Sequence, residues 1–498
     1  MTPKPNNSTE RPPIVAVLGH VDHGKSTLLD FIRKSNVVAT EAGGITQHVA
    51  AYEVVHKNKR ITFIDTPGHA AFSAIRARGA SAADIAILVV AADDGVKAQT
   101  LEALKSIRDT NTPFIVALNK IDKPTADIAR TQRMLLEQNV YLEKFGGDVP
   151  WAAVSAKVGT GVEELLDLIL LVAEMEGFTG DPSAAAQGYV IESHRDQKRG
   201  LAATLIVKNG TLHSGMSVRA GRAIAPVRIM EDYSGVALEE ASFSSPVQLI
   251  GFDELPNVGE EFYAYETKHE AEDARPAEAP AGSTHAAPHL LAEGEVGPFT
   301  MPVIVRADVS GSLEAIAQET EKLGDEHARV SIVQSGIGAV SENDVKAAIA
   351  SNGSVVVGFN VVIDAPAFAL ALQHGIKIET FTIIYKLTER LEELLGERAP
   401  KRLVENTTGR ARILKHFSSR KDAQVVGGKV VDGFLSRGAT VRIMRRNELV
   451  GTGKLKNVQA NKQDVDRIEE GREFGAQVAC ECEIAEGDVI EAFTSSMQ

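Results

Sequence analysis

Hydrophobic positions in the first 180 residues form short apolar runs separated by amphipathic stretches. Four of the runs are IVAVLG (14–19), ITFID (61–65), IAILVVAA (85–92) and PFIVALNK (113–120). Short apolar strands that alternate with helices predict a mostly parallel sheet with helices on both faces. We therefore predict an α/β domain over 12–178, preceded by a disordered lead-in over 1–11.

The pattern changes after residue 178. Residues 179–268 alternate apolar and polar positions in short runs broken by turns, and KNGT (208–211) is a hairpin signal. This pattern predicts a small β barrel. Residues 269–298 are rich in Ala, Pro, Glu and Gly, so we predict a linker there.

A second alternation of strands and helices begins at residue 299. It predicts a small α/β/α sandwich domain over 299–381, followed by a charged connecting helix over 382–400 that Pro400 closes. Residues 401–498 contain strands joined by hairpin turns and predict a C-terminal β barrel. The predicted fold class is multidomain α/β plus β.

Composition supports a folded protein of several domains. The chain has 498 residues, of which 44% are hydrophobic and 24% charged, and its net charge is -14. This acidic balance argues against a protein that coats DNA by charge alone. No apolar run approaches the roughly 18 residues that span a bilayer, and the N-terminus has no apolar segment typical of a signal peptide. We therefore expect a cytoplasmic protein, and two cysteines exclude a disulfide framework.

The strongest chemical motif is GHVDHGKS (19–26), which lies between a predicted strand and a predicted helix. It fits the P-loop spacing G-x-x-x-x-G-K-[ST]. Glycines let backbone N–H groups surround phosphates, and the following helix N-terminus favours negative charge. Lys25 is expected to reach the β and γ phosphates, and Ser26 to supply an oxygen to Mg²⁺.

Two further motifs indicate the base. The run PFIVAL ends in Asn119, Lys120, Ile121 and Asp122, and Ser155, Ala156 and Lys157 follow the later strand WAAV. A carboxylate at Asp122 can accept from both N1–H and the exocyclic amine of guanine, whereas adenine offers no such donor pair. Alone, NKID would fit an ordinary turn at a strand end, but behind a P-loop it predicts a GTP site.

Two segments are candidates for sensing the γ phosphate. Asp65, Thr66, Pro67 and Gly68 follow the strand ITFI, which suits a carboxylate touching Mg²⁺ through water and a glycine N–H meeting the phosphate. Upstream, residues 41–46 form a glycine-containing stretch in which Thr46 is placed to sense Mg²⁺ and the γ phosphate. Such loops order on GTP and relax after hydrolysis.

These motifs resemble the translational GTPase superfamily, whose P-loop reads GHVDHGK and whose third motif reads DTPGH. Within it, four segments resemble the bacterial translation initiation factor two family: EAGGITQHVAAY (41–52), ADVSGSLEAI (307–316), SGIGAVSENDV (335–345) and VVGFNV (356–361). The resemblance runs from about Pro12 to the C-terminus, without the long N-terminal extension of many members.

The resemblance implies roles for single residues. His69 would be the catalytic histidine that orients the attacking water, with Val21 and Ile45 forming an apolar gate before it. Asp22 would lie near a monovalent cation, whereas the side chains of His20 and His23 are expected to be structural. The expected GTP-binding residues are Gly19, His20, Val21, Asp22, His23, Gly24, Lys25, Ser26, Thr27, Thr46, Asp65, Thr66, Pro67, Gly68, His69, Asn119, Lys120, Asp122, Ser155, Ala156 and Lys157. Ser26, Thr46 and, through water, Asp65 would hold Mg²⁺.

No arginine occurs between Glu41 and His56, so that loop supplies no arginine finger. Intrinsic GTP hydrolysis should therefore be slow and depend on an external activator, which the resemblance identifies as the ribosome.

The C-terminal module combines opposite charges. Residues 401–462 hold 15 Lys and Arg against 4 Asp and Glu, and residues 463–498 hold 2 against 10. The basic part suits structured RNA, although a solvated strand face would have the same pattern. The resemblance implies a barrel that holds the formylmethionyl end of initiator tRNA. Candidate contacts are Lys462, Phe474, Gly475, Glu486 and Gly487.

We therefore predict a translation initiation factor that hydrolyses GTP on the ribosome, stabilises formylmethionyl initiator tRNA on the small subunit and promotes subunit joining. Its expected partners are both ribosomal subunits, initiator tRNA and other initiation factors, with no membrane, and we expect a monomer. Two alternatives are an elongation-type GTPase carrying aminoacyl-tRNA and a GTP-gated RNA-binding protein without catalysis.

Overall fold

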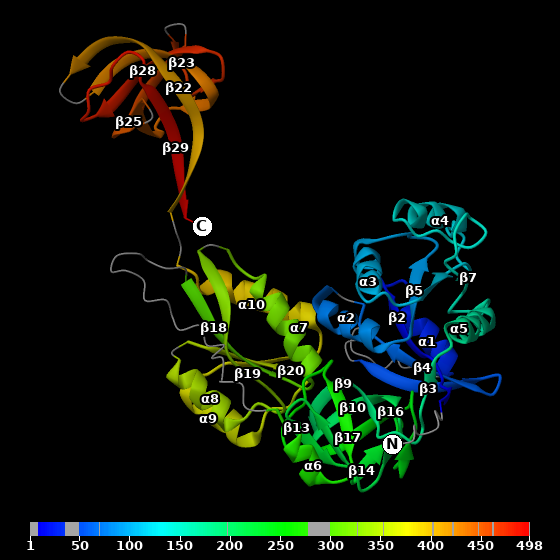
Figure 1. The fold of residues 1–498 in the computed structure, drawn as a ribbon. Coiled ribbons are helices and arrows are strands. Elements are labelled where there is room, and N and C mark those ends of the chain that lie inside the picture. Colours follow the sequence, from blue (N-terminus) through cyan, green and yellow to red (C-terminus); the bar gives the residue numbers. More distant parts are fainter. Residues whose placement is uncertain are drawn as a thin grey trace. The chain divides into compact units, whose positions relative to one another are not determined.

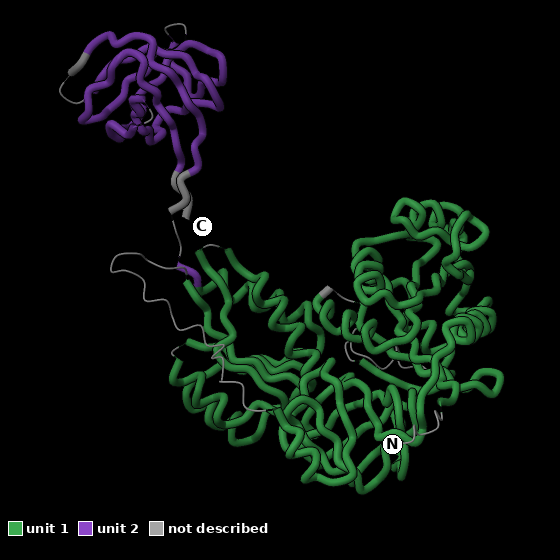
Figure 2. Tube along the Cα trace, viewed as in Figure 1, with its two compact units in different colours: residues 1–398 green, residues 399–498 purple. Residues whose placement is uncertain are grey.

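A computed structural model describes residues 8–34, 49–68, 70–196, 198–276, 299–325, 327–351, 353–400, 403–420, 423–446, 448–460 and 463–497. The chain divides into two compact units, residues 1–398 and residues 399–498 (Figure 2). Within the described ranges, no helix combines the length and the apolar character needed to cross a bilayer.

The first domain is built on a six-stranded sheet (Figure 1). Its strands, in spatial order, are β3 (Ala50–His56), β4 (Lys59–Asp65), β2 (Ile14–Gly19), β5 (Ile85–Ala91), β6 (Phe114–Asn119) and β7 (Trp151–Ala153). All neighbours are parallel except β3 and β4. Parallel strands place their carboxyl ends along one edge, where open α/β sheets bind ligands.

Helices cover both faces of this sheet. They are α1 (Lys25–Arg33), α2 (Ser73–Ala82), α3 (Ala98–Asp109), α4 (Ile128–Glu137) and α5 (Val162–Glu176), with the short helix η2 (Ala70–Phe72) before α2. Successive residues of β2 point to opposite faces of the sheet and lie in different hydrophobic cores. Val15 lies in the core that holds Leu165 of α5, and Ala16 lies in the core that holds Leu104 of α3. This confirms the predicted α/β domain.

The predicted disordered lead-in over 1–11 is wrong for its last residues, which are ordered. Strand β1 (Thr9–Glu10) pairs antiparallel with β8 (Thr179–Gly180), and Arg11 is buried. The partner strand lies about 170 residues away in the sequence, so local composition carried no signal of this pairing. Residues 1–7 lie outside the described ranges.

The second domain is a barrel-like antiparallel sheet around its own core. In spatial order its strands are β13 (Ala223–Pro226), β12 (Ser217–Ala220), β17 (Glu261–Tyr265), β9 (Gln187–Asp196), β10 (Gly200–Asn209), β16 (Pro246–Phe252) and β14 (Ile229–Glu231), and β11 (Leu212–His213) pairs separately with β15 (Glu240–Ala241). This agrees with the predicted small β barrel.

The predicted linker begins too early. Helix α6 (Lys268–Asp273) starts with a capping box between Thr267 and Glu270, and Arg275 Nε donates to the carbonyl oxygen of Arg222 at 2.7 Å. These contacts hold residues 268–275 on the barrel, which the Ala- and Pro-rich composition concealed. Residues 277–298 lie outside the described ranges.

The third domain has a four-stranded parallel sheet in the order β19 (Ala328–Ile337), β18 (Phe299–Ala307), β20 (Val355–Phe359), β21 (Ile378–Phe381). Its helices are α7 (Ser310–Glu321), α8 (Glu342–Ala350), α9 (Ala365–His374) and α10 (Ile384–Arg398). Helix α10 packs Leu387, Leu391 and Leu394 into the same core as Val303 of β18. The predicted connecting helix therefore belongs to this domain's sandwich.

The second unit is a closed antiparallel barrel. Its strands are β22 (Leu403–Arg420), β29 (Val489–Met497), β24 (Thr440–Arg445), β25 (Glu448–Ala460), β28 (Glu473–Cys480) and β23 (Ala423–Ser436), with β27 (Arg467–Glu469) on β23 and β26 (Gln463–Asp464) on β25. Pairing of β22 with β23 closes the ring, which confirms the predicted C-terminal barrel.

Candidate functional site

The P-loop connects β2 to α1 through two glycines with positive φ. Gly19 has φ 148°, and a Cβ there would lie 2.4 Å from the carbonyl oxygen of Val89. Gly24 has φ 86°, and a Cβ there would lie 2.4 Å from Nδ2 of Asn119. A side chain at Gly19 would meet backbone that the sheet holds in place, and one at Gly24 would meet an amide group that is fixed by its own hydrogen bonds. The positive φ values add to this steric limit, so the loop geometry requires glycine.

Lys25 opens α1 and is buried. Its Nζ donates to the carbonyl oxygens of Gly19 at 3.0 Å and His20 at 2.8 Å. Burial lowers the pKa of Lys25 to about 8, against the opposing charge of Asp65. A Cβ on Gly68 would lie 2.2 Å from Lys25 Nζ, so the loop 65–68 reaches the P-loop lysine.

Hydroxyl and carboxylate oxygens stand at the end of β4 and at the start of α1. Asp65 ends β4, Thr66 Oγ1 donates to the carbonyl oxygen of Val17 at 2.9 Å, and Ser26 lies in the first turn of α1. Hydroxyl and carboxylate oxygens are the ligands that Mg²⁺ prefers. Thr27 follows on the exposed side of α1, and Pro67 accepts a 3.5 Å contact from Arg76.

Asn119 joins the three motif loops. Its Nδ2 donates to the carbonyl oxygen of His23 at 2.8 Å, and its Oδ1 accepts from the backbone N–H of Ala156 at 2.9 Å. The buried amide thus ties the P-loop to the segment 155–157. Both links come from the carboxyl end of β6, as a site at that sheet edge requires.

Asp122 is oriented by Ser155. Ser155 Oγ donates to Asp122 Oδ1 at 2.6 Å, and this hydrogen bond holds the pKa of the carboxyl below its ordinary value. Lys120 takes a left-handed conformation with φ 63°, and Lys157 is exposed. An ionised, exposed carboxylate beside an ordered turn can accept hydrogen bonds from N1–H and the exocyclic amine of guanine.

Several predicted residues fall outside the described ranges. They are Ile45, Thr46, His69 and Lys462. Their roles remain as the sequence predicts them.

Two neighbours of the P-loop were missing from the sequence prediction. The backbone N–H of Val21 donates to Gln99 Oε1 at 2.8 Å, and Arg76 of α2 is 1% exposed and donates to Glu102 at 2.6 Å. Both residues lie on helices, α3 and α2, and the sequence pattern does not reveal which helical face meets the phosphate loop.

The side chains of His20 and His23 lie beside Asp94 in the loop after β5. His23 is 1% exposed, and burial together with the charge of His20 lowers its pKa to about 4. Asp22 is exposed with φ 62°. The structural role expected for His23 fits its burial.

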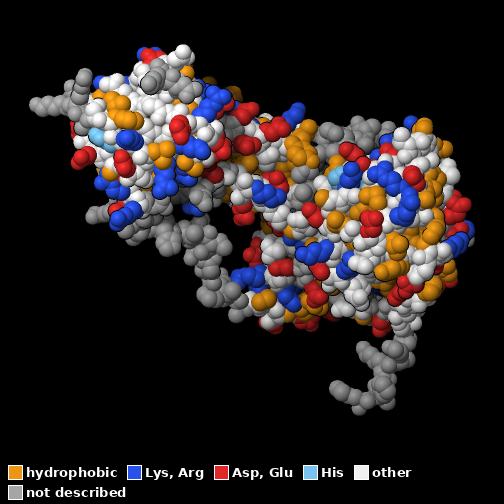
Figure 3. All heavy atoms as spheres, turned by 90° about the horizontal axis from the view of Figure 1, so that it is seen from above, with side chains coloured by type: hydrophobic (Ala, Val, Ile, Leu, Met, Phe, Trp, Pro, Cys, Tyr) orange, Lys and Arg blue, Asp and Glu red, His pale blue; other side chains and the backbone are white. Residues whose placement is uncertain are grey.

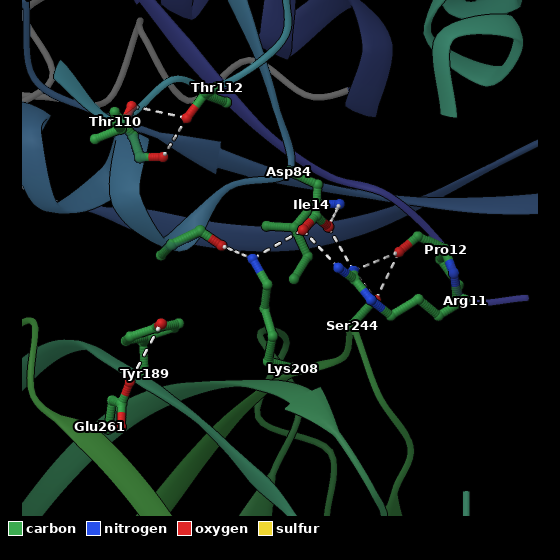
Figure 4. A network of polar contacts seen from close by, with 12 residues as sticks. Arg11, Pro12, Ile14, Asp84, Thr110, Thr112, Tyr189, Lys208, Ser244 and Glu261 are labelled. Carbon is green, nitrogen blue, oxygen red and sulfur yellow. Dashed lines mark hydrogen bonds and ion pairs between the residues drawn. The ribbon is translucent and has the colours of Figure 1, made fainter. Parts of the chain in front are cut away.

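A buried network joins the first two domains (Figure 4). Asp84 accepts from both Arg11 guanidinium nitrogens, from the backbone N–H of Ile14 at 2.9 Å and from Lys208 Nζ at 2.8 Å. Burial alone would raise the pKa of Asp84, but the Arg11 hydrogen bond and the Lys208 charge hold it below its ordinary value. Ser244 of the barrel donates to the carbonyl oxygen of Pro12 at 2.6 Å.

In the second unit, one candidate contact is corrected. Phe474 is 5% exposed and packs in the barrel core, so its ring does not line an open pocket. The register explains this, because Phe474 faces inward while the next residue, Gly475, has open space where a Cβ would stand. Glu486 and Gly487 are exposed, and the adjacent Asp488 is held by Arg445 at 2.8 Å.

Basic and apolar side chains share the outer surface of this barrel. Blue Lys and Arg side chains are interspersed with orange hydrophobic ones on the face seen in Figure 3. Leu414 is 52% and Phe417 60% exposed, and Lys415 Nζ lies 5.8 Å from the centroid of the Phe417 ring. Aromatic and basic groups together suit single-stranded nucleic acid.

Three parts of the chain match family models. Residues 10–175 match the elongation factor Tu GTP binding domain, residues 185–265 match elongation factor G domain 2, and residues 287–392 match translation-initiation factor 2.

Whole-chain relatives agree with these matches. Translation initiation factor IF-2 of Rubrobacter xylanophilus is 41% identical over 497 residues, covering 98% of this chain and 72% of that protein. Its counterpart in Pelotomaculum thermopropionicum is 42% identical, covering 98% of this chain and 51% of that protein, so the chain spans about half of that relative's length. The crystal structure of GDP-bound aIF5B from Aeropyrum pernix is 28% identical, covers 97% of this chain and 92% of that chain, and has a TM-score of 0.48. Because it is 41% identical to the Rubrobacter xylanophilus protein and covers 72% of that protein's length, the chain belongs to the translation initiation factor IF-2 family of translational GTPases.

Proposed function

We propose that this chain binds and hydrolyses GTP on the ribosome during translation initiation in the cytoplasm. The observation that carries the proposal is the pair of hydrogen bonds through Asn119, which join the P-loop to the loop that holds Asp122 through Ser155. This arrangement supports a single nucleotide site in which the P-loop would bind the phosphates and Asp122 would bind the guanine base.

The residues divide the work of hydrolysis. Lys25 and the P-loop N–H groups would bind the β and γ phosphates, while Ser26 and Thr46 would hold Mg²⁺ and Asp65 would hold it through water. Bound Mg²⁺ supplies charge neutralisation for phosphoryl transfer. His69 would orient the attacking water behind the gate of Val21 and Ile45, and Asp22 would hold a monovalent cation that supplies positive charge near the phosphates. Without an activator, hydrolysis should proceed at about 10⁻⁴ to 10⁻² s⁻¹.

The C-terminal barrel would bind the formylmethionyl end of initiator tRNA on the small subunit. The exposed basic and aromatic groups on this barrel, and the family to which the chain belongs, support that assignment. The chain would then act as a monomer with both ribosomal subunits and other initiation factors, and promote subunit joining.

Phosphate release from the full chain tests this proposal. Ribosomal subunits with initiator tRNA should accelerate release strongly, and His69→Ala should remove about 10²-fold or more of that acceleration while GTP affinity stays within a few-fold. His213→Ala, an exposed histidine of the second domain, serves as the matched control.

The same assay separates the alternatives. An elongation-type carrier would be stimulated equally by elongator aminoacyl-tRNA, and a GTP-gated binding protein would release no additional phosphate. Normal stimulated turnover in His69→Ala would overturn the catalytic assignment.

A further inference from the structure

We propose that His20, His23 and Asp94 form a binding site for a first-row transition-metal ion, for which Zn²⁺ is the best match. This site is separate from the proposed Mg²⁺ site, which uses Ser26 and Asp65. It would lie on the side of the P-loop that faces the loop after β5.

The geometry brings three ligand atoms together. In the described ranges, His20, His23 and Asp94 each offer one ligand atom, and these atoms lie within 4.8 Å of one another. His23 Nε2 is 3.5 Å from Asp94 Oδ2, close to the separation of about 3.4 Å between two ligands at roughly 2.1 Å on a tetrahedral Zn²⁺. Small side-chain rotations would bring in the third ligand.

The buried imidazole nitrogens are only weakly compensated. Among the described residues, neither ring nitrogen of His23 nor Nδ1 of His20 makes a hydrogen bond of normal geometry, and His23 Nε2 has only its long contact with Asp94 Oδ2 at 3.5 Å. Buried polar atoms normally find a partner, so an ion at this place would satisfy a group that the protein leaves unsatisfied. The ring planes cross at 78°, so the rings do not stack against each other.

The donor set selects the kind of ion. Two imidazoles and one carboxylate suit Zn²⁺ and its neighbours in the first transition row, whereas Mg²⁺ prefers oxygen ligands alone. Oδ1 of Asp94 forms an ion pair with Lys97 Nζ at 2.8 Å, and its other oxygen, Oδ2, faces His23. Three protein ligands would leave a fourth position for water.

Binding would tie two loops of the nucleotide site. His20 and His23 enclose Val21 and Asp22 in the P-loop, while Asp94 belongs to the loop that follows β5. An ion held by both loops should stabilise the folded domain by mass action, because the unfolded chain does not hold the three ligands together.

Cobalt provides a direct probe of this site. The full chain, without a polyhistidine tag and free of nucleotide and phosphate, is titrated with Co²⁺, whose four-coordinate complexes absorb visibly, and then with Zn²⁺. We expect one Co²⁺ per chain with tetrahedral bands that Zn²⁺ removes, and a Zn²⁺-dependent rise in the midpoint of thermal unfolding.

Ligand variants decide the outcome. Asp94→Ala and His20→Gln should each weaken Co²⁺ binding by at least about tenfold and abolish the thermal shift. Asp109→Ala, which removes an exposed carboxylate at the end of α3, should change neither. An unchanged spectrum and affinity in Asp94→Ala, or no stoichiometric Co²⁺ binding by the parent chain, would overturn the proposal.

Discussion

At the scale of single residues, Asn119 connects two loops of the nucleotide site. Its one amide group serves two loops, because the NH₂ donates to the P-loop and the carbonyl oxygen accepts from Ala156. Asp122, three residues later, lies in the exposed turn after the same strand, where Ser155 orients its carboxylate. The positions of both residues follow from the end of β6.

Asp122→Asn should change the preferred base. A carboxylate accepts two guanine donors, whereas an amide at this position pairs with the additional carbonyl group of xanthine. We expect the preference for GTP over xanthosine triphosphate to fall by at least about 100-fold, measured as the ratio of the two dissociation constants. Asp127→Asn is the control, because asparagine also caps α4. An unchanged ratio would mean that NKID is only a turn.

Lys25 should take up protons when nucleotide binds at alkaline pH. Its pKa of about 8 in the empty site means that it loses its proton as the pH rises through 8, and nearby phosphates would raise that pKa again. We expect uptake of roughly half a proton per GDP at pH 8, measured by calorimetry in buffers of different ionisation enthalpy.

Lys25→Arg is the matched variant, because arginine stays protonated throughout this range. Its proton uptake at pH 8 should be smaller than that of the parent chain by the same half proton. Equal uptake in both proteins would contradict the lowered pKa.

At the scale of elements, the sequence predicted structure that depends on local residue patterns better than structure that depends on distant contacts. The apolar runs at 14–19, 85–92 and 113–120 became β2, β5 and β6, because buried parallel strands need continuous apolar sequence. The P-loop, NKID and SAK segments were found because phosphate and guanine recognition restrict the residue types that serve them. Long-range contacts escaped prediction, as the pairing of β1 with β8 and the hydrogen bond from Arg275 to Arg222 show, since the partners are distant in the sequence. Helix α6 was missed although its capping box, Thr267 and Glu270, is a local signal.

The sequence also offered no sign of the role of Asp84, because it belongs to no recognisable motif. In the structure its carboxylate forms ion pairs with Arg11 and with Lys208, which come from different domains. Asp84→Ala should destabilise the first unit by about 3–5 kcal/mol, because Arg11 and Lys208 would keep buried charges without their carboxylate. The expected result is a lower urea midpoint of unfolding.

Glu272→Ala is the control for this prediction. It removes an exposed ion pair with Lys268 and should change stability by less than about 1 kcal/mol. Equal midpoints for Asp84→Ala and Glu272→Ala would show that the buried network does not stabilise the junction of the two domains.

At the scale of the whole molecule, the chain forms two separate compact units. The second has its own core and a closed ring of strands, so residues 399–498 should fold when expressed alone. We predict that this fragment binds formylmethionyl-tRNA without GTP. Its affinity should fall with salt at a log–log slope of about -0.7 to -0.9 per phosphate neutralised.

This fragment should also bind formylated methionyl-tRNA more tightly than unformylated methionyl-tRNA, which electrostatic attraction alone would not explain. A free ammonium buried without a partner would cost several kcal/mol, so unformylated methionyl-tRNA should bind more weakly. Because Phe474 belongs to the core, exposed residues such as Glu486 and those around Gly475 are the positions to vary first. Equal binding of both tRNAs would leave only electrostatic attraction.

The strand order of this barrel also determines when it can form during synthesis. Strand β29 is the last of its strands to be made, yet it lies between β22, the first, and β24. Until residues 489–497 leave the ribosomal tunnel, both neighbours expose unpaired edges, which are templates for pairing with other chains. The barrel therefore completes its folding only after translation of its whole length, and a nascent chain stalled before β29 should be the form that aggregates.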